Sequence, residues 1–176
     1  LRIWGNSSVN LSGGQLNATI IHNSSGGQFN FTGGRLAVSE FYGDLHNQGG
    51  ILAPGNSPGS AQVFGDYTQS IDGVFAVEIG GLLAGTEYDT LDISGTATLA
   101  GTLDIDWYDF GDGPYSGSIG DSFDILSADI LFGEFDLVTL AILDQGAMWQ
   151  IDYLSDEIGQ TDVVRLSIVS AVPLPQ

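Results

Sequence analysis

A short motif returns in this chain after twenty residues. Leu11-Ser12-Gly13-Gly14-Gln15-Leu16 is followed by Phe31-Thr32-Gly33-Gly34-Arg35-Leu36. The asparagines at positions 10, 17, 23 and 30 are spaced by seven, six and seven residues. A twenty-residue unit with three sides of this length is typical of a parallel β-solenoid (β-helix), in which each coil stacks on the next. The repeat therefore predicts a continuous apolar core and a ladder of asparagines at one corner.

The hydrophobic residues alternate with polar ones in short segments, as in Val9-Asn10-Leu11 and Phe29-Asn30-Phe31. This period of two is typical of half-buried strands, and no run shows the spacing of an amphipathic helix. The sequence therefore predicts an all-β protein. The residues expected in its core are Leu16, Phe29, Leu36, Leu52, Val77, Leu99, Leu103 and Ile105.

The repeat divides the chain into three expected parts. Residues 1–105 are predicted to form solenoid coils of about twenty residues, and residues 106–171 a less regular, β-rich C-terminal cap. Residues 172–176 are expected to form an extended tail. An antiparallel β-sandwich is the alternative fold for the same strands.

The charge is strongly one-sided and unevenly spread. Asp and Glu number 22 against three arginines and no lysine, which gives a net charge of −19. Residues 1–60 hold two acids and two arginines, so the whole net charge falls on residues 61–176. Such a chain repels nucleic acid and anionic lipid. No apolar run is long enough to span a membrane, and the absence of cysteine excludes disulfides and thiolate metal sites.

One segment resembles a known family signature. Gly43-Asp44-Leu45-His46-Asn47-Gln48-Gly49-Gly50-Ile51-Leu52-Ala53-Pro54-Gly55-Asn56-Ser57-Pro58-Gly59 resembles the motif of secreted bacterial proteins with autotransporter-associated β-strand repeats. The stretches 65–69, 88–103 and 120–126 continue that resemblance, and Val172-Pro173-Leu174-Pro175 resembles the opening of a PEP-CTERM sorting signal. The resemblance implies an exported, extracellular or cell-surface bacterial protein. The chain opens without methionine or a leader, so we expect a mature protein or a part of a longer one.

The residues that could carry catalysis do not form a recognisable set. His22 and His46 lie beside asparagines in Gly-rich segments and are expected to be solvated turn residues. Asp104 and Asp106 flank Ile105, so they should point outward while Leu103, Ile105 and Trp107 point inward. We therefore predict no enzyme activity, and no catalytic, cofactor-binding or metal-binding residue. A carbohydrate-active β-helix enzyme is a third hypothesis for the function, after the structural and binding roles given below, since such enzymes use paired acids.

Two further patterns have both a functional and a structural interpretation. Asp106, Asp109, Asp112 and Asp121 could hold a structural Ca²⁺ ion, or they form a solvated acidic loop. The asparagines that lie in Asn-x-Ser/Thr triplets are glycosylation acceptors, or they are simply the residues that solenoid corners favour. These are Asn6, Asn10, Asn17, Asn23 and Asn30.

The function expected from these features is structural. We expect an exported protein of the bacterial cell surface, biofilm matrix or an extracellular filament, which assembles head to tail with itself. Ile3 and Trp4 would then be buried against a neighbouring copy, which lends a strand such as residues 163–169. The alternative is an adhesin or polysaccharide-binding module that uses exposed aromatic residues such as Tyr67, Trp107 and Tyr108.

Overall fold

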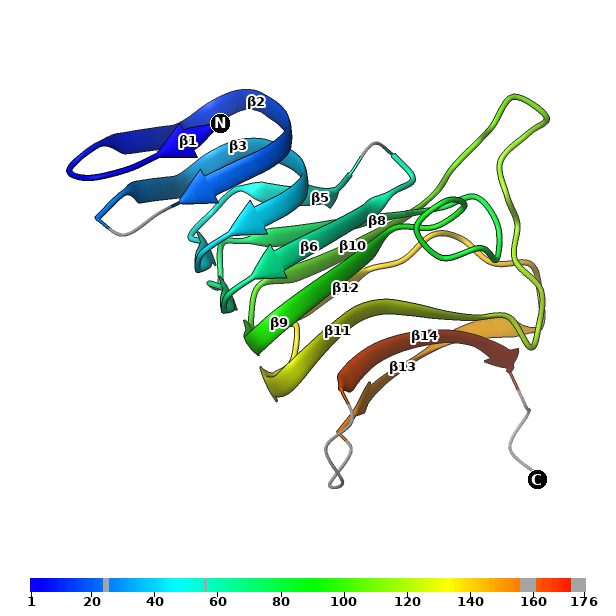
Figure 1. Cartoon of the computed structure of the whole chain (residues 1–176). Helices are drawn as coiled ribbons and strands as arrows, with labels where there is room; N and C mark the ends of the chain where they lie inside the picture. The colour runs from blue at the N-terminus through cyan, green and yellow to red at the C-terminus, as the bar shows by residue number, and fades with distance from the viewer. Residues whose placement is uncertain (24–25, 56, 156–160, 172–176) are drawn as a thin grey trace.

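The computed structural model describes residues 1–23, 26–55, 57–155 and 161–171. No residue in these ranges lies in a helix, so the all-β prediction is confirmed. The strands, shown in Figure 1, are β1 (Arg2–Ile3), β2 (Ser8–Asn23), β3 (Gln28–Tyr42), β4 (Leu45–Asn47), β5 (Ile51–Pro54), β6 (Ser60–Phe64), β7 (Tyr67–Gln69), β8 (Val74–Ile79), β9 (Thr90–Leu99), β10 (Thr102–Trp107), β11 (Ser122–Gly133), β12 (Leu137–Thr139), β13 (Ala147–Leu154) and β14 (Asp162–Ser170).

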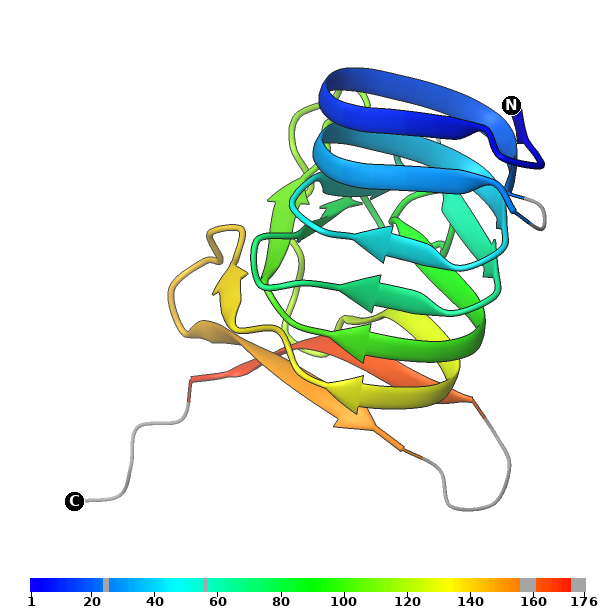
Figure 2. The same ribbon diagram turned by 90° about the vertical axis from the view of Figure 1, so that its left-hand side faces the viewer.

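These strands form one large mixed sheet that is mostly parallel. Its main path runs β12-β10-β8-β5-β3-β4-β7-β9-β11-β14-β13, with β1, β2 and β6 paired beside it. Among the named strands of the described residues, only β11–β14 and β13–β14 pair antiparallel. Figure 2 shows the successive strands stacked in layers from the N-terminal end to the hairpin of β13 and β14. An antiparallel sandwich would need antiparallel neighbours throughout, so the alternative fold is wrong.

The register confirms the twenty-residue spacing only at the N-terminal end. Leu16 pairs with Leu36, and every other paired position of β2 and β3 except Ser12 is also twenty residues apart. Further along, Leu36 pairs with Leu52, sixteen residues on, and Ala61 pairs with Leu91, thirty residues on. The predicted constant spacing up to residue 105 is therefore wrong. Strand pairing fixes only the strands, so loops such as residues 80–89 lengthen a layer without disturbing its register.

The core follows the predicted alternation closely. Seven of the eight expected core residues are buried, and Leu36, Leu52 and Leu103 are completely so. Leu16 is only half-buried, although it packs against the same core. The reason is its place in the outermost layer, where β1 reaches only His22 and Asn23 and no other strand of the described residues pairs with β2 on that side.

The turns between layers depend on close backbone contact. At Gly65 a Cβ atom would lie 2.6 Å from the carbonyl carbon of Gly43, and at Gly43 it would lie 2.7 Å from the carbonyl oxygen of Asn23. Gly43 also has a positive φ of 110°, which only glycine adopts without strain. Glycine at these turns therefore lets successive layers approach to hydrogen-bonding distance.

The asparagine ladder forms at one of the predicted positions. Asn30 donates its side-chain N–H to the Oδ1 atom of Asn10 at 2.7 Å, and the two residues are directly paired. Asn17 pairs instead with Ala37, so the ladder does not extend to it. Deeper in the stack the corner is held by two buried side chains, Asn47 and Gln69, which also lie in register.

Asn47 and Gln69 satisfy backbone groups that the turns leave free. Asn47 accepts a hydrogen bond from the N–H of Gly50 at 2.8 Å. Gln69 donates to the carbonyl oxygens of Ala100 at 2.8 Å and Thr102 at 3.0 Å. Buried polar side chains are stable only when they are paired in this way. The sequence analysis included both residues in the family resemblance but did not predict that they are buried.

The two ends of the stack differ. At one end, the antiparallel hairpin of β13 and β14 covers the core with Val164, Leu166 and Ile168. The change to antiparallel pairing begins at β11, whereas the predicted boundary at residue 105 lies inside β10. Parallel pairing continues past that residue through β11 and β12. The expected tail, residues 172–176, lies outside the described residues.

Within the described part of the chain, no helix is long and apolar enough to cross a membrane.

The uneven charge predicts a salt effect on stability. The layers after residue 60 carry the whole net charge of −19, so their carboxylates repel one another. Raising NaCl from about 10 to 500 mM shortens the Debye length from about 30 Å to under 8 Å. We expect the thermal midpoint at pH 7 to rise by about 3–6 °C, which corresponds to about 1–2 kcal/mol for a chain of this size.

Scanning calorimetry at several salt concentrations measures this effect. The same series at pH 4, where many carboxylates are protonated, should show a smaller rise. An identical midpoint at all salt concentrations at pH 7 would show that repulsion among the carboxylates does not lower the stability of the fold.

Candidate functional site

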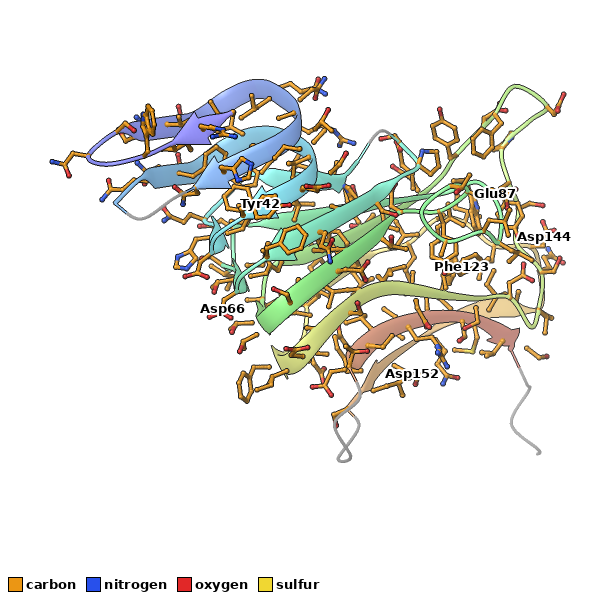
Figure 3. The ribbon with its side chains drawn as sticks, viewed as in Figure 1. Tyr42, Asp66, Glu87, Phe123, Asp144 and Asp152 are labelled. Atoms are coloured by element: carbon orange, nitrogen blue, oxygen red, sulfur yellow. The ribbon has the colours of Figure 1, made fainter. Side chains whose placement is uncertain are left out.

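The two histidines lie in strands rather than in turns. His22 is in β2 and stacks on Tyr42, with ring centroids 4.4 Å apart, and Tyr42 stacks in turn on Phe64 at 4.3 Å. The three rings occupy paired positions of β2, β3 and β6, and Figure 3 shows Tyr42 on the outside of the stack. His46 is exposed in β4. In the column formed by His22, Tyr42 and Phe64, each ring covers the face of its neighbour, so the role of these side chains in the described structure is packing.

Asp104 and Asp106 point outward as predicted. They alternate along β10 with Leu103 and Ile105, which are buried. Partial burial raises the pKa of Asp104, and the neighbouring charge of Asp106 raises it further. Trp107 is half-buried, and its ring packs against Tyr115 and Trp149.

The acidic loop after β10 uses its carboxylates to hold backbone groups. Asp109 accepts the N–H groups of Gly111 at 2.6 Å and Gly113 at 3.0 Å. Asp121 accepts the hydroxyl of Tyr115 at 2.7 Å and the N–H of Ser118 at 2.6 Å. Across the described ranges, no group of three or more His, Cys, Asp or Glu side chains could hold a metal ion. The hypothesis of a calcium site therefore finds no support in the geometry.

Other acidic residues do the same between layers. Asp44 accepts the N–H of Asp66 at 3.0 Å, and Asp66 accepts the N–H of Thr96 at 2.8 Å. Figure 3 shows Asp66 at the edge of the stacked strands. Within a single loop, Glu87 accepts the N–H groups of Leu82 at 2.9 Å and Leu83 at 3.0 Å. Carboxylates that accept backbone N–H groups form stronger bonds than neutral acceptors do, which gives these acids a structural role.

One of the aromatic residues expected on the surface is buried. Tyr67 is completely buried, and its hydroxyl donates to the Oε1 atom of Gln69 at 2.7 Å. Burial raises the pKa of the Tyr67 hydroxyl well above its ordinary value. The predicted surface role of Tyr67 is therefore wrong. Its side chain points inward, as do those of Gln69, two residues further along β7, and of Leu45, its paired neighbour in β4. Its hydroxyl therefore needs a hydrogen-bond partner in the interior, and Gln69 provides it.

A groove of about 690 Å³ lies on the outer face of the N-terminal strands. Residues of β2 and β3 form its floor, and Gly55, Ser57 and Tyr108 form its wall. Figure 1 shows the chain after β10, which begins with Tyr108, rising toward the level of these strands. The lining residues are Gln15, Asn17, Ala18, Thr19, Arg35, Ala37, Ser39, Gly55, Ser57 and Tyr108.

Arg35 is the charged residue of this groove. It lies in register between Gln15 of β2 and Ile51 of β5, and its side chain is half-buried. Arg165, at the far end of the stack, binds Asp124 through two hydrogen bonds. Among the described residues, Arg35 makes no ion pair of this kind.

Asp89 is a completely buried acid near Arg35. Its two carboxyl oxygens accept the N–H of Gly59 at 2.6 Å and the N–H of Glu78 at 2.9 Å. Burial raises the pKa of Asp89 to about 7, and the charge of Glu78 contributes, while the two N–H groups and Arg35 act in the opposite direction. The Oε2 atom of Glu78 is itself buried without a hydrogen-bond partner in the described structure. Asp89 thus ties the turn that precedes β6 to strand β8.

The sequence analysis missed this arrangement. Asp89 lies thirty residues from Gly59, and no local pattern indicates that the two meet. The groove was missed for the same reason, because Arg35 and Tyr108 approach each other only through the stacking of layers.

A second hollow of about 470 Å³ lies further along the stack. Its lining includes Asp92 and Asp124, but Asp124 binds Arg165 and Asp92 accepts the hydroxyl of Ser127. These carboxylates are already engaged, which makes the Arg35 groove the better candidate for a ligand site.

No family model matches the chain, and no curated protein matches it. The resemblance to proteins with autotransporter-associated repeats therefore remains a prediction that rests on the quoted residues.

Proposed function

We propose that the chain is an exported bacterial structural protein, built as a parallel β-solenoid, that assembles head to tail. The parallel pairing of β2, β3, β5, β8 and β10 in successive layers supports the solenoid, as does the twenty-residue register of β2 and β3. The glycine turns at Gly43 and Gly65 support it as well, because they let one layer lie directly on the next.

The observation that carries the assembly is the free edge of β2. On one side β2 pairs with β3, while on the other it pairs only with β1, at His22 and Asn23. No strand among the described residues pairs with residues 8–19 on that second side. Unpaired strand edges of this length recruit further strands. Leu16 adds an apolar contact there, since its paired neighbour Leu36 is completely buried and Leu16 is not.

The expected donor strand, residues 163–169, lies in β14, which already pairs with β11 and β13, and Ile3 is already buried in its own chain, although Trp4 is exposed. Both details of the expected contact are therefore wrong, and the other partner is instead the free edge at the far end of a second copy. Figures 1 and 2 place the hairpin of β13 and β14 at the opposite end of the stack from β2. Strand β13 pairs only with β14 among the described strands, so its outer edge is free as well, with Met148 and Leu154 exposed. The end at β2, residues 1–23, holds Arg2 and no acidic residue, whereas residues 61–176 are strongly acidic. The two unlike ends therefore repel each other less than two acidic ends would. A contact between unlike ends does not close and extends into a filament.

A structural role also fits the engagement of the acids. Asp66, Asp89, Asp109 and Asp121 accept backbone N–H groups that hold turns and layers together. We place the protein at the cell surface or in an extracellular matrix on the strength of the sequence resemblance. The segment that resembles a sorting signal, Val172–Pro175, lies outside the described residues.

Sedimentation velocity at several protein concentrations tests the assembly. We expect the chain to form species that grow with concentration, and Leu16→Asp to remain monomeric because it places a charge in the contact. Asn17→Asp is the matched control, since it adds the same charge to the same strand on its outward face, and it should behave as the parent. A parent chain that stays monomeric at all concentrations, salt levels and calcium levels would contradict the proposal.

A further inference from the structure

We propose that the groove over β2 and β3 binds an acidic polysaccharide, with Arg35 contacting a sugar carboxylate. This inference goes beyond the structural role and does not depend on assembly. It rests on the chemistry of the groove lining, on the charge around Arg35 and on the shape of the groove.

The lining matches the hydrogen-bonding needs of a sugar chain. Gln15 and Asn17 present planar amides, and Gln15 donates to the Oδ1 atom of Asn17 at 2.9 Å, which fixes their orientation. Thr19, Ser39 and Ser57 add hydroxyl groups that both donate and accept. Sugar hydroxyls bind such groups with paired hydrogen bonds, whereas an apolar ligand would leave them unsatisfied.

The charge of the groove selects an anion. Arg35 has no ion pair among the described residues, and it lies in the part of the chain that carries no net charge. Asp89, whose carboxyl interacts electrostatically with Arg35, has a pKa raised by burial to about 7, so below that pH it is mostly neutral and does not cancel the charge of Arg35. The planar guanidinium group binds carboxylates through two parallel hydrogen bonds. Elsewhere the surface is acidic and repels an anionic polymer.

The shape favours a chain over a small ion. At about 690 Å³ the groove lies within the ~300–1,000 Å³ range of ligand pockets, which is far more than a single inorganic anion needs. Tyr108 lies at its wall, with its ring packed edge-on against Phe110 at 4.8 Å. A fixed aromatic ring of this kind offers an apolar surface to the C–H face of a sugar.

Isothermal titration calorimetry with oligogalacturonate tests the inference, using maltooligosaccharide of the same length as the neutral comparison and sodium sulfate as the simple anion. We expect binding of oligogalacturonate only. Arg35→Gln should weaken the affinity by about tenfold or more, since a charge-assisted pair is lost. Arg2→Gln removes the same charge from outside the groove and should leave the affinity within about twofold.

The outcomes separate the alternatives. Equal binding of the neutral oligosaccharide, or equal effects of Arg35→Gln and Arg2→Gln, would overturn the role of Arg35. Binding of sulfate as tight as that of the oligomer would reduce the groove to a simple anion site and overturn the proposal, as would the absence of any binding. Thermal melts of both variants test whether the fold is retained, and sedimentation reports separately on assembly.

Discussion

Leu36→Asp should unfold the N-terminal layers of the protein. Leu36 is completely buried, and it is paired with Leu16 on one side and Leu52 on the other. An aspartate at this position loses the apolar contacts and places an unpaired charge in the core, which together cost about 4 kcal/mol or more. Circular dichroism during chemical denaturation measures the loss. We expect a separate early transition or complete unfolding of the variant.

Leu16→Asp provides the matched control for this prediction. It makes the same chemical change at the paired position of the neighbouring strand, where the side chain is only half-buried. Water can reach the new carboxylate there, so we expect the monomer to lose less than half as much stability. If both variants melt like the parent, or if Leu16→Asp is the more damaging in the monomer, the proposed inward face is wrong.

Stability should fall as the pH rises from about 4 to about 7 because of Asp89. The pKa of its buried carboxyl is raised to about 7, above the ordinary value of 3.8 that it has in the unfolded chain. The folded state therefore holds the proton more tightly, so the stabilising contribution is complete below pH 4 and is lost as the pH rises through 7. At about 1.4 kcal/mol per pKa unit, the difference amounts to about 4 kcal/mol. Urea denaturation at intervals of half a pH unit measures this slope.

Asp89→Asn separates this effect from the repulsion among the other carboxylates. The amide keeps an acceptor oxygen for one of the two backbone N–H groups, of Gly59 and Glu78, but turns a donor toward the other. We expect the variant to be less stable than the parent at pH 4 by about 1–3 kcal/mol, with a flatter dependence on pH. A slope identical to that of the parent would show that the titration of Asp89 does not govern stability in this range.

The sequence predicted what depends on local alternation and on the repeat. Period-two patterns placed Leu36, Leu103 and Ile105 in the core and Asp104 on the surface, since neighbouring side chains of a strand must face opposite ways. The repeat of the Leu11 segment also predicted the register of β2 on β3. These features follow from residues close together in the chain or from a motif that is visibly repeated in the sequence.

The sequence failed where the outcome depends on what lies in the next layer. Leu16 has the same local pattern as Leu36 and differs only in having no strand beyond it. Tyr67 was expected among the exposed aromatic residues, but it is buried, and Gln69 in the interior accepts the hydrogen bond of its hydroxyl. Asp89 meets Gly59 only because the loop between β8 and β9 folds back on the preceding layer.

The candidate groove was beyond prediction for the same reason. Arg35 was identified only as part of a repeated motif, and Tyr108 only as one of several aromatic residues. Their positions on one groove follow from the stacking of β2 and β3 and from the path of the chain after β10. Residue types alone do not contain that information, because the strand pairings that bring them together span many residues.

The most direct test of head-to-tail stacking is the structure of the assembled material. Electron cryomicroscopy and fibre diffraction should show filaments one chain wide, with a reflection along the filament axis at about 4.7–4.8 Å, the spacing between paired strands. Leu16→Asp should yield none. Single particles of uniform size from the parent chain, or filaments without that axial spacing, would contradict the account.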